Sequence, residues 1–220
     1  MPPNQVANVD ESMADLSHPQ PRSVTDRNRL CNKSDLFGAL TGRRRGLRFD
    51  PELLYVGAMF HDIGLTERYR GSRDRFEVDG ANAARDFLRS YGIPEAGIEL
   101  VWDAIALHTT PGIPEHKKPE VALVTSGVEM DVLGIAYDQF TDAQREAVVH
   151  AYPRGGDFKN EIIRAFYDGM KHRPESTFGT VNDDVLAHLD PTFRRDDFCS
   201  IILRSPWDRS PGNGAGSPRT

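Results

Sequence analysis

The residues of this chain best suited to chemistry are His61 and Asp62, which stand side by side at the end of an apolar stretch. A histidine nitrogen and a carboxylate oxygen are both good ligands for a divalent ion such as Zn²⁺ or Fe²⁺. Adjacent helical residues point about 100° apart, so they can bind one ion only where a helix ends or bends. Asp50 and Pro51 are typical of a helix start, and Gly64 is typical of a helix end. The sequence therefore predicts a buried helix that carries both side chains inward and stops at Gly64.

Other polar residues also lie at the ends or on the inward faces of predicted helices. Asp131 lies within an unusually apolar stretch, where an unpaired carboxylate is costly, so a metal, an arginine or a capping interaction must compensate it. Glu129 faces elsewhere and is expected at a boundary. His108 ends an apolar run before a Pro-Gly turn, which suits a side chain at the mouth of a pocket. Glu77 and Asp79 open a helix, and the helix dipole explains their position as well as a catalytic role does.

Helical periodicity organises most of the chain. Apolar residues recur at helical spacing over residues 27–41, 76–91, 95–109 and 119–135, and the last of these is apolar around its circumference, which is typical of a central helix. Later starts are indicated by a capping box at Thr141–Gln144, by Asp157, and by Asp190-Pro191 before a helix over residues 193–203. Alternation typical of strands is nearly absent. The predicted fold is all-α.

The composition favours one domain between two tails. A chain of 220 residues is long enough for a sizeable core. Residues 1–25 mix Pro, Asn, Ser and Asp without periodicity, and residues 205–220 are rich in Gly, Pro and Ser. Both compositions are typical of disordered segments. We therefore expect a disordered segment over residues 1–25, a helical domain over residues 26–204 and a disordered tail over residues 205–220.

Charge and hydropathy argue against several classes of partner. The formal net charge of −6 at pH 7 disfavours broad binding to nucleic acid or to anionic membranes. No apolar run approaches the ~20 residues of a membrane span, and the N-terminus does not resemble a signal peptide. Cys31 and Cys199 are far apart, which suits free thiols in a reducing compartment. We expect a cytoplasmic protein that acts on a small molecule, with Val148, Ile162 and Phe166 packing either internally or in a homo-oligomer.

Taken in order, several motifs resemble the HD-domain superfamily of metal-dependent hydrolases, and within it the cyanamide hydratase-like branch. These motifs are Leu54–Leu65, Phe76-Glu77-Val78-Asp79-Gly80, Leu107-His108-Thr109 and Met130-Asp131-Val132-Leu133-Gly134, and the resemblance covers about residues 28–172. It implies an HD-like helical bundle with a divalent metal, Zn or Fe, held by His61, Asp62 and Asp131. It also implies that His108 and Glu77 are polar residues near the pocket, suited to proton transfer.

The chain departs from this family pattern at one position. The first metal ligand of the family is expected to be a histidine in the helix before the His-Asp pair, but the sequence there reads Cys31-Asn32-Lys33-Ser34-Asp35. A protonated lysine cannot bind a metal, and its charge opposes a divalent ion unless burial lowers its pKa. Either Asp35 or water repairs the site, or the site is weakened.

The first functional hypothesis is a metal-dependent hydratase or hydrolase of a cyanamide- or nitrile-like small molecule. A metal-activated water would attack the carbon atom, and His108 or Glu77 would transfer the proton.

Two alternatives stay open at this point. One is hydrolysis of a phosphomonoester or nucleotide, which needs cations for the phosphate, and Arg68, Arg70 and Arg73 follow the His-Asp pair closely. The other is a degenerate relative that keeps the fold without turnover, because Lys33 stands in place of the expected histidine.

Overall fold

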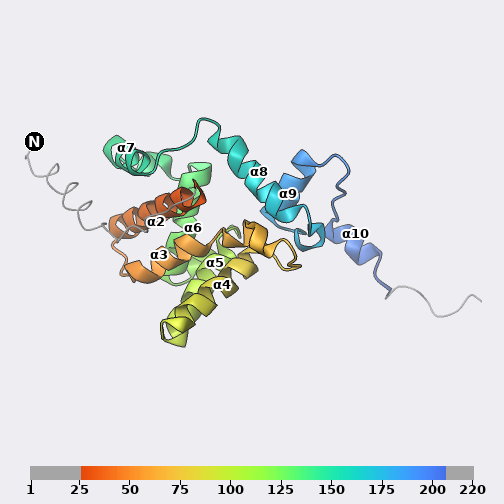
Figure 1. The fold of residues 1–220 in the computed structure, drawn as a ribbon, viewed down its shortest axis with the longest axis horizontal. Helices are drawn as coiled ribbons and strands as arrows, with labels where there is room; N and C mark the ends of the chain where they lie inside the picture. Colours follow the sequence, from red (N-terminus) through yellow and green to blue (C-terminus); the bar gives the residue numbers. More distant parts are fainter. Residues whose placement is uncertain (1–25, 207–220) are drawn as a thin grey trace, which may run out of the picture.

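A computed structural model describes residues 26–206, and this part of the chain is helical with no strand (Figure 1). The α-helices are α2 (Asp26–Arg44), α3 (Pro51–Phe60), α4 (Phe76–Ser90), α5 (Glu95–Leu107), α6 (Pro119–Val128), α7 (Asp142–Ala151), α8 (Phe158–Met170), α9 (Val181–Leu189) and α10 (Phe198–Leu203). Single turns of 3₁₀ helix are η1 (Ile63–Leu65), η2 (Glu67–Tyr69), η3 (Pro114–His116), η5 (Tyr137–Gln139) and η6 (Pro174–Ser176), and η4 (Glu129–Leu133) is a π-helical turn. The predicted all-α fold is confirmed. The disorder expected of residues 1–25 and 207–220 concerns segments outside the described residues.

The core is organised around α6, as its apolar circumference predicts. This helix packs against α2, α3 and α5, and α4 packs against α5 on the outer side (Figure 1). Val121, Leu123 and Val124 of α6 are buried together with residues of α2, α3 and α5. Farther along the chain, α8 and α9 lie side by side. The ends of α3, α5 and α6 are thereby brought to the interior of one bundle.

Two of the residues that the sequence assigned either to the interior or to a subunit interface, Val148 and Phe166, pack within the chain. Val148 of α7 is buried in a cluster with Phe37 and Met130. Phe166 of α8 packs edge-on against Phe76, with ring centroids 5.5 Å apart. Within residues 26–206, no helix has the length and apolar character needed to cross a bilayer.

The predicted start of the helix over residues 193–203 is wrong. Asp190 is the C-cap of α9, a helix that the periodicity did not predict, and its carboxylate accepts a hydrogen bond from the backbone N–H of Thr192 at 2.8 Å. The next helix, α10, begins only at Phe198, and Asp197 caps it by accepting from the N–H of Ser200 at 2.9 Å. An aspartate before a proline also initiates turns, so the same local signal had two solutions.

Gly64 does not end a helix in the left-handed conformation, which corrects the sequence prediction. Helix α3 ends earlier, at Phe60, and Gly64 lies within η1 without a positive φ. Its backbone instead passes against the start of α4, where a Cβ atom on Gly64 would lie 2.1 Å from the carbonyl oxygen of Phe76. Real side-chain atoms do not approach this closely, so close backbone packing is what requires glycine here.

We expect Gly64→Ala to destabilise the protein by on the order of 3 kcal/mol, because the added methyl group must push η1 away from α4. Urea unfolding of the two proteins measures the difference in unfolding free energy. Gly71→Ala is the matched control, since a Cβ at Gly71 meets no atom within 4 Å. Equal stability of the Gly64→Ala variant and the wild type would contradict the close-packing account.

Candidate metal centre

Two helix ends bring three potential metal ligands together. His61 is the C-cap of α3, Asp62 follows it, and His108 is the C-cap of α5. One ligand atom from each residue lies within 4.8 Å of the other two. Both histidines are buried, and their rings meet edge to face with centroids 5.0 Å apart. The neighbours His61 and Asp62 can face one site because the helix has already ended at Phe60.

Backbone hydrogen bonds define which nitrogen of each ring faces the site. The Nδ1 atom of His61 lies 2.7 Å from the carbonyl oxygen of Ala58, and Nδ1 of His108 lies 2.6 Å from that of Ile105. A carbonyl oxygen only accepts, so the proton of each neutral ring is on Nδ1 and the lone pair is on Nε2. The Nε2 atoms lie 3.2 Å and 3.7 Å from the carboxylate oxygens of Asp62.

The cluster contains buried polar atoms that lack hydrogen-bond partners. Oδ1 of Asp62 and Nε2 of His108 are both in this state. Such atoms are rare in folded proteins because desolvation without a partner is costly. A divalent cation would satisfy both atoms at once. The residues present therefore fit a metal ion.

The charge on Asp62 also suits a metal ligand. Burial favours the neutral carboxyl, but the charge of His61 and His108 when protonated, with the hydrogen bonds that they then donate, outweighs this effect and holds the pKa of Asp62 well below its usual range. The side chain is therefore a carboxylate at neutral pH. One carboxylate with two imidazole nitrogens is a donor set that suits Zn²⁺ or Fe²⁺.

Asp131 does not belong to the group formed by His61, Asp62 and His108. It is buried in η4, and its Oδ1 accepts a hydrogen bond from Arg154 at 2.5 Å and lies 3.7 Å from Nζ of Lys33. Burial raises the pKa of Asp131, although Lys33, Arg154 and His61 act in the opposite direction. Of the three compensations that the sequence allowed, the structure shows the arginine. Oδ2 of Asp131 has no hydrogen-bond partner, so its role as a metal ligand stays a prediction.

Lys33, in place of the expected histidine, is a buried basic residue. Its side chain is 1% exposed. Burial lowers the pKa of Lys33, while the charge of Asp131 raises it. The centroid of the Phe158 ring lies 4.8 Å from Nζ of Lys33 and 4.4 Å from the guanidinium carbon of Arg154. When protonated, the lysine places positive charge beside Asp131, as a metal ion would.

Asp35 is buried in the same helix but lies outside the group of His61, Asp62 and His108. Burial raises the pKa of Asp35 to about 7. The structure thus shows a carboxyl group in an apolar environment rather than a fourth member of the cluster. Its substitution for the missing histidine stays a prediction.

Glu77 is fully buried and forms part of the framework of the site. Its carboxylate accepts a hydrogen bond from the hydroxyl of Thr109 and pairs with Arg75 at 3.0 Å. These contacts join the first turn of α4 to the residue that follows His108. A role for Glu77 in proton transfer stays a prediction.

His108 is the residue whose place changes most from the sequence to the structure. The sequence predicts a proton-transfer residue at a pocket mouth, whereas the fold places its Nε2 beside Asp62. A signal for this role exists in the sequence, because both histidines follow the end of an apolar helix. Which helix ends meet, however, depends on the packing of α3 against α5.

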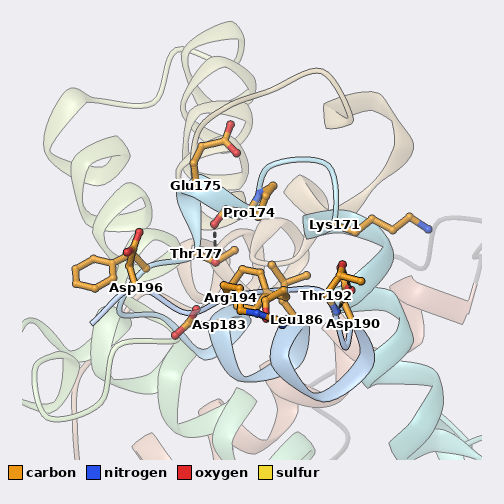
Figure 2. A pocket seen from close by; sticks show the side chains of 12 residues that line it. Lys171, Pro174, Glu175, Thr177, Asp183, Leu186, Asp190, Thr192, Arg194 and Asp196 are labelled. Atoms are coloured by element: carbon orange, nitrogen blue, oxygen red, sulfur yellow. Dashed lines mark hydrogen bonds between the residues drawn. The ribbon is translucent and has the colours of Figure 1, made fainter. Parts of the chain in front are cut away.

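A separate hollow of about 390 Å³ lies near η6 and α9 (Figure 2). It is lined by Lys171, Pro174, Glu175, Thr177, Phe178, Asp183, Leu186, Asp190, Thr192, Phe193, Arg194 and Asp196. None of these side chains belongs to the cluster of His61, Asp62 and His108. No other predicted site residue, Asp131 included, lines it either, so we do not assign this hollow to the site.

Comparison with known protein families gives a match in the central part of the chain. Residues 30–133 match the family model of the HD domain. HD domains are typically metal-dependent hydrolases, and His61, Asp62, His108 and Asp131 all fall within the match. The match is to the HD domain as a whole and does not select the cyanamide hydratase-like branch. No curated protein matches the chain.

We expect Asp35→Asn to stabilise the protein increasingly as the pH rises from about 4 to 7. The folded-state pKa is about 7 against 3.8 for the ordinary carboxyl, so the unfolded chain loses its proton first. Folding therefore loses stability over this range, by up to on the order of 4 kcal/mol above pH 7, and the asparagine variant avoids the loss. Urea unfolding at several pH values measures the effect, with the exposed Asp86→Asn as control. A difference between variant and wild type that stays constant from pH 4 to pH 8 would contradict it.

We expect His61→Ala and His108→Ala each to weaken Zn²⁺ binding at least tenfold, because each variant removes one of three converging ligands. Isothermal titration calorimetry on metal-free protein gives the dissociation constants. The exposed His116→Ala is the control for adventitious binding by surface histidines. Wild-type affinity in His108→Ala would remove His108 from the ligand set.

Proposed function

We propose, from the HD domain at residues 30–133, that this protein is a metal-dependent hydrolase whose substrate is a phosphomonoester of a small molecule. The observation that carries the proposal is the buried cluster of His61, Asp62 and His108, in which Asp62 Oδ1 and His108 Nε2 lack hydrogen-bond partners. These three residues would hold the ion. A bound Zn²⁺ or Fe²⁺ supplies hydroxide at neutral pH by lowering the pKa of a coordinated water.

A cleft lined by Asp131 supports a substrate of substantial size, although His61, Asp62 and His108 do not line it. It has a volume of about 1070 Å³ and is lined by η4, α7 and the start of α8. Asp131 forms part of its wall, and charge on His61 opposes the burial that raises the Asp131 pKa. Sites for drug-sized ligands have volumes of about 300–1000 Å³. The cleft is therefore large for a molecule such as cyanamide and suited to a bulkier substrate.

The side chains of the cleft support a phosphate joined to an apolar group. Arg154 lines it beside Asp131, and Arg145 and Lys159 also line it. Arginine binds phosphate oxygens through a planar fork of donors. Leu133 and Tyr137 are more than half exposed and provide an apolar surface along the same cleft. In this proposal Arg154 orients the phosphate, and the apolar surface holds the remainder of the substrate.

Arg154 is better placed for this role than the arginines that follow the His-Asp pair. Arg70 pairs with Glu67 at 2.9 Å, Arg73 lies 3.8 Å from Glu175, and Arg68 stacks on the ring of Tyr69. All three arginines are exposed, and none of them lines the cleft. They remain a weaker alternative for phosphate binding.

Two other functions remain to be tested against this one. Hydration of a cyanamide- or nitrile-like molecule would use the same metal cluster, with His108 or Glu77 transferring a proton to nitrogen. A protein that keeps the fold without turnover is supported by the buried Lys33 beside Asp131. Substrate assays on metal-loaded protein separate the three.

We expect metal-loaded protein to release inorganic phosphate from phosphomonoesters, and Arg154→Met to lower kcat/KM at least tenfold because a phosphate-binding fork is lost. The assay uses p-nitrophenyl phosphate and nucleoside 5′-monophosphates, with cyanamide in parallel. Arg164→Met, an exposed position on α8, is the matched control. Metal affinity measured on each variant separates loss of substrate binding from loss of the metal.

The other outcomes decide between the alternatives. Urea formation from cyanamide without phosphate release would favour the hydratase. Stoichiometric metal binding with neither activity would leave phosphomonoesters unsupported, and a protein that binds no metal would favour the degenerate fold.

A further inference from the structure

Arg173 is a buried arginine that lies 40 residues beyond residue 133, where the match to the HD domain ends. It is the N-cap of η6, directly after α8, and its side chain is 1% exposed. Burying a guanidinium is costly unless its charge and its donors are matched by partners. The partners of Arg173 therefore show what the buried charge holds together.

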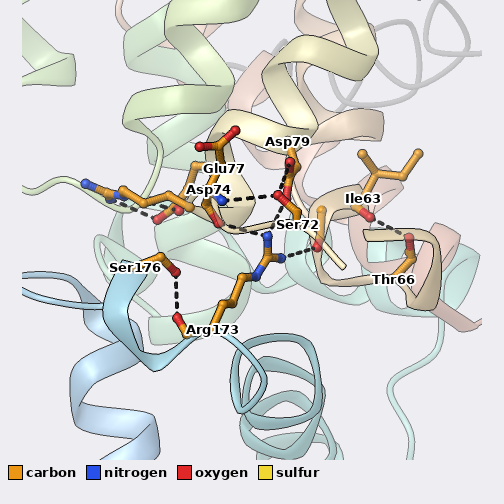
Figure 3. A network of polar contacts seen from close by, with 10 residues as sticks. Ile63, Thr66, Ser72, Asp74, Glu77, Asp79, Arg173 and Ser176 are labelled. Atoms are coloured by element: carbon orange, nitrogen blue, oxygen red, sulfur yellow. Dashed lines mark hydrogen bonds and ion pairs between the residues drawn. The ribbon is translucent and has the colours of Figure 1, made fainter. Parts of the chain in front are cut away.

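One guanidinium joins three segments that are distant from it in sequence (Figure 3). Its Nη2 donates to the carbonyl oxygen of Gly64 at 2.7 Å, and Nη1 donates to that of Asp74 at 2.8 Å. Nη1 also pairs with the carboxylate of Asp79, in the first turn of α4. The hydroxyl of Ser72 donates to the other oxygen of Asp79 at 2.9 Å.

The first of these segments leads directly from the metal ligands. Gly64 is two residues after Asp62, which is the N-cap of η1. The N–H of Leu65 donates to the carbonyl oxygen of Asp62 at 3.0 Å, and the N–H of Thr66 donates to that of Ile63 at the same distance. Holding the Gly64 carbonyl therefore holds the short turn that sets the backbone of Asp62.

The segment that contains Asp79, the start of α4, contacts the cluster at His108. The ring of Phe76 lies edge-on to the ring of His108, with centroids 5.6 Å apart. Glu77 accepts the hydroxyl of Thr109, the residue after His108. Through Asp79 and Gly64, Arg173 thus fixes α4 and η1 relative to one another, and these two elements support His108 and Asp62 respectively.

We propose that Arg173 is a positioning residue for the metal centre, and that the segment from α8 to η6 belongs to the functional unit although it lies outside the matched family region. The inference rests on the proposed function in taking His61, Asp62 and His108 as the metal ligands. Lysine at this position would keep the positive charge but has no planar fork, so it cannot reproduce the bonds to Gly64, Asp74 and Asp79 together.

The experiment compares Arg173→Lys with Leu88→Ala. Leu88 is buried at the far end of α4, so its truncation lowers global stability without touching this network. Hydrogen exchange of the Leu65 and Thr66 amides is measured by NMR on metal-free protein, and the Zn²⁺ dissociation constant is measured by calorimetry. We expect Arg173→Lys to reduce the exchange protection of both amides at least tenfold, because η1 opens locally. We expect the Zn²⁺ affinity to fall at least tenfold as well. Leu88→Ala should change neither, even at an equal loss of Tm.

Wild-type protection of Leu65 and Thr66 in folded Arg173→Lys would overturn the proposal, as would an equal effect of Leu88→Ala. Should Arg173→Lys not fold, Asp79→Asn gives the same comparison, because it keeps the side-chain shape and removes the charge that faces Arg173. If wild-type protein binds no Zn²⁺ while exchange still rises in the variant, the metal proposal fails and the positioning of the Asp62 turn by Arg173 stands.

Discussion

The candidate site depends on a hydrogen bond that is made twice, from a histidine Nδ1 to the carbonyl oxygen three residues earlier. Each histidine caps its own helix, and the bond to Ala58 or Ile105 places the ring proton on the side away from the cluster. Both Nε2 lone pairs are then directed towards Asp62. A buried pair of lone pairs beside a carboxylate is unfavourable unless a proton or a metal ion lies among them. That unfavourable arrangement is the strongest physical indication of a cation site.

The two buried aspartates of the central region are compensated in different ways. Beside Asp62 lie two imidazoles, which favour its charged form when they are protonated, and its Oδ1 has no hydrogen-bond partner. Asp131 already has Lys33 and Arg154, and burial nevertheless raises its pKa. The chain thus has a buried lysine in place of the expected histidine, and it retains a cluster of three potential metal ligands. The first aspartate belongs to this candidate metal site, and the second pairs with an arginine that lines the cleft.

The functional unit of this fold extends beyond the part that matches the HD domain. Helix α8 carries Phe166 to the ring of Phe76 and ends just before Arg173, whose bonds reach Gly64 and Asp79. Gly64 itself lies so close to the start of α4 that no side chain fits between them. The region around the His-Asp pair is therefore supported from both sides, by the close approach of α4 and by a buried ion pair from the C-terminal part of the described chain. Rigid support of this kind is what a metal site with preset geometry requires.

Local patterns were enough to predict the helical class, most helix positions, the capping box at Thr141–Gln144 and the placing of His61 and Asp62 at a helix end. These features depend on periodicity and on bonds between residues a few positions apart, which a sequence displays directly. Tertiary structure alone decided that His108 faces Asp62, that Arg154 reaches Asp131 and that Arg173 reaches Asp79 across 94 positions. It also gave Gly64 a packing role in place of a helix-ending one. Such contacts depend on which helices pack together, and no local spacing records that choice.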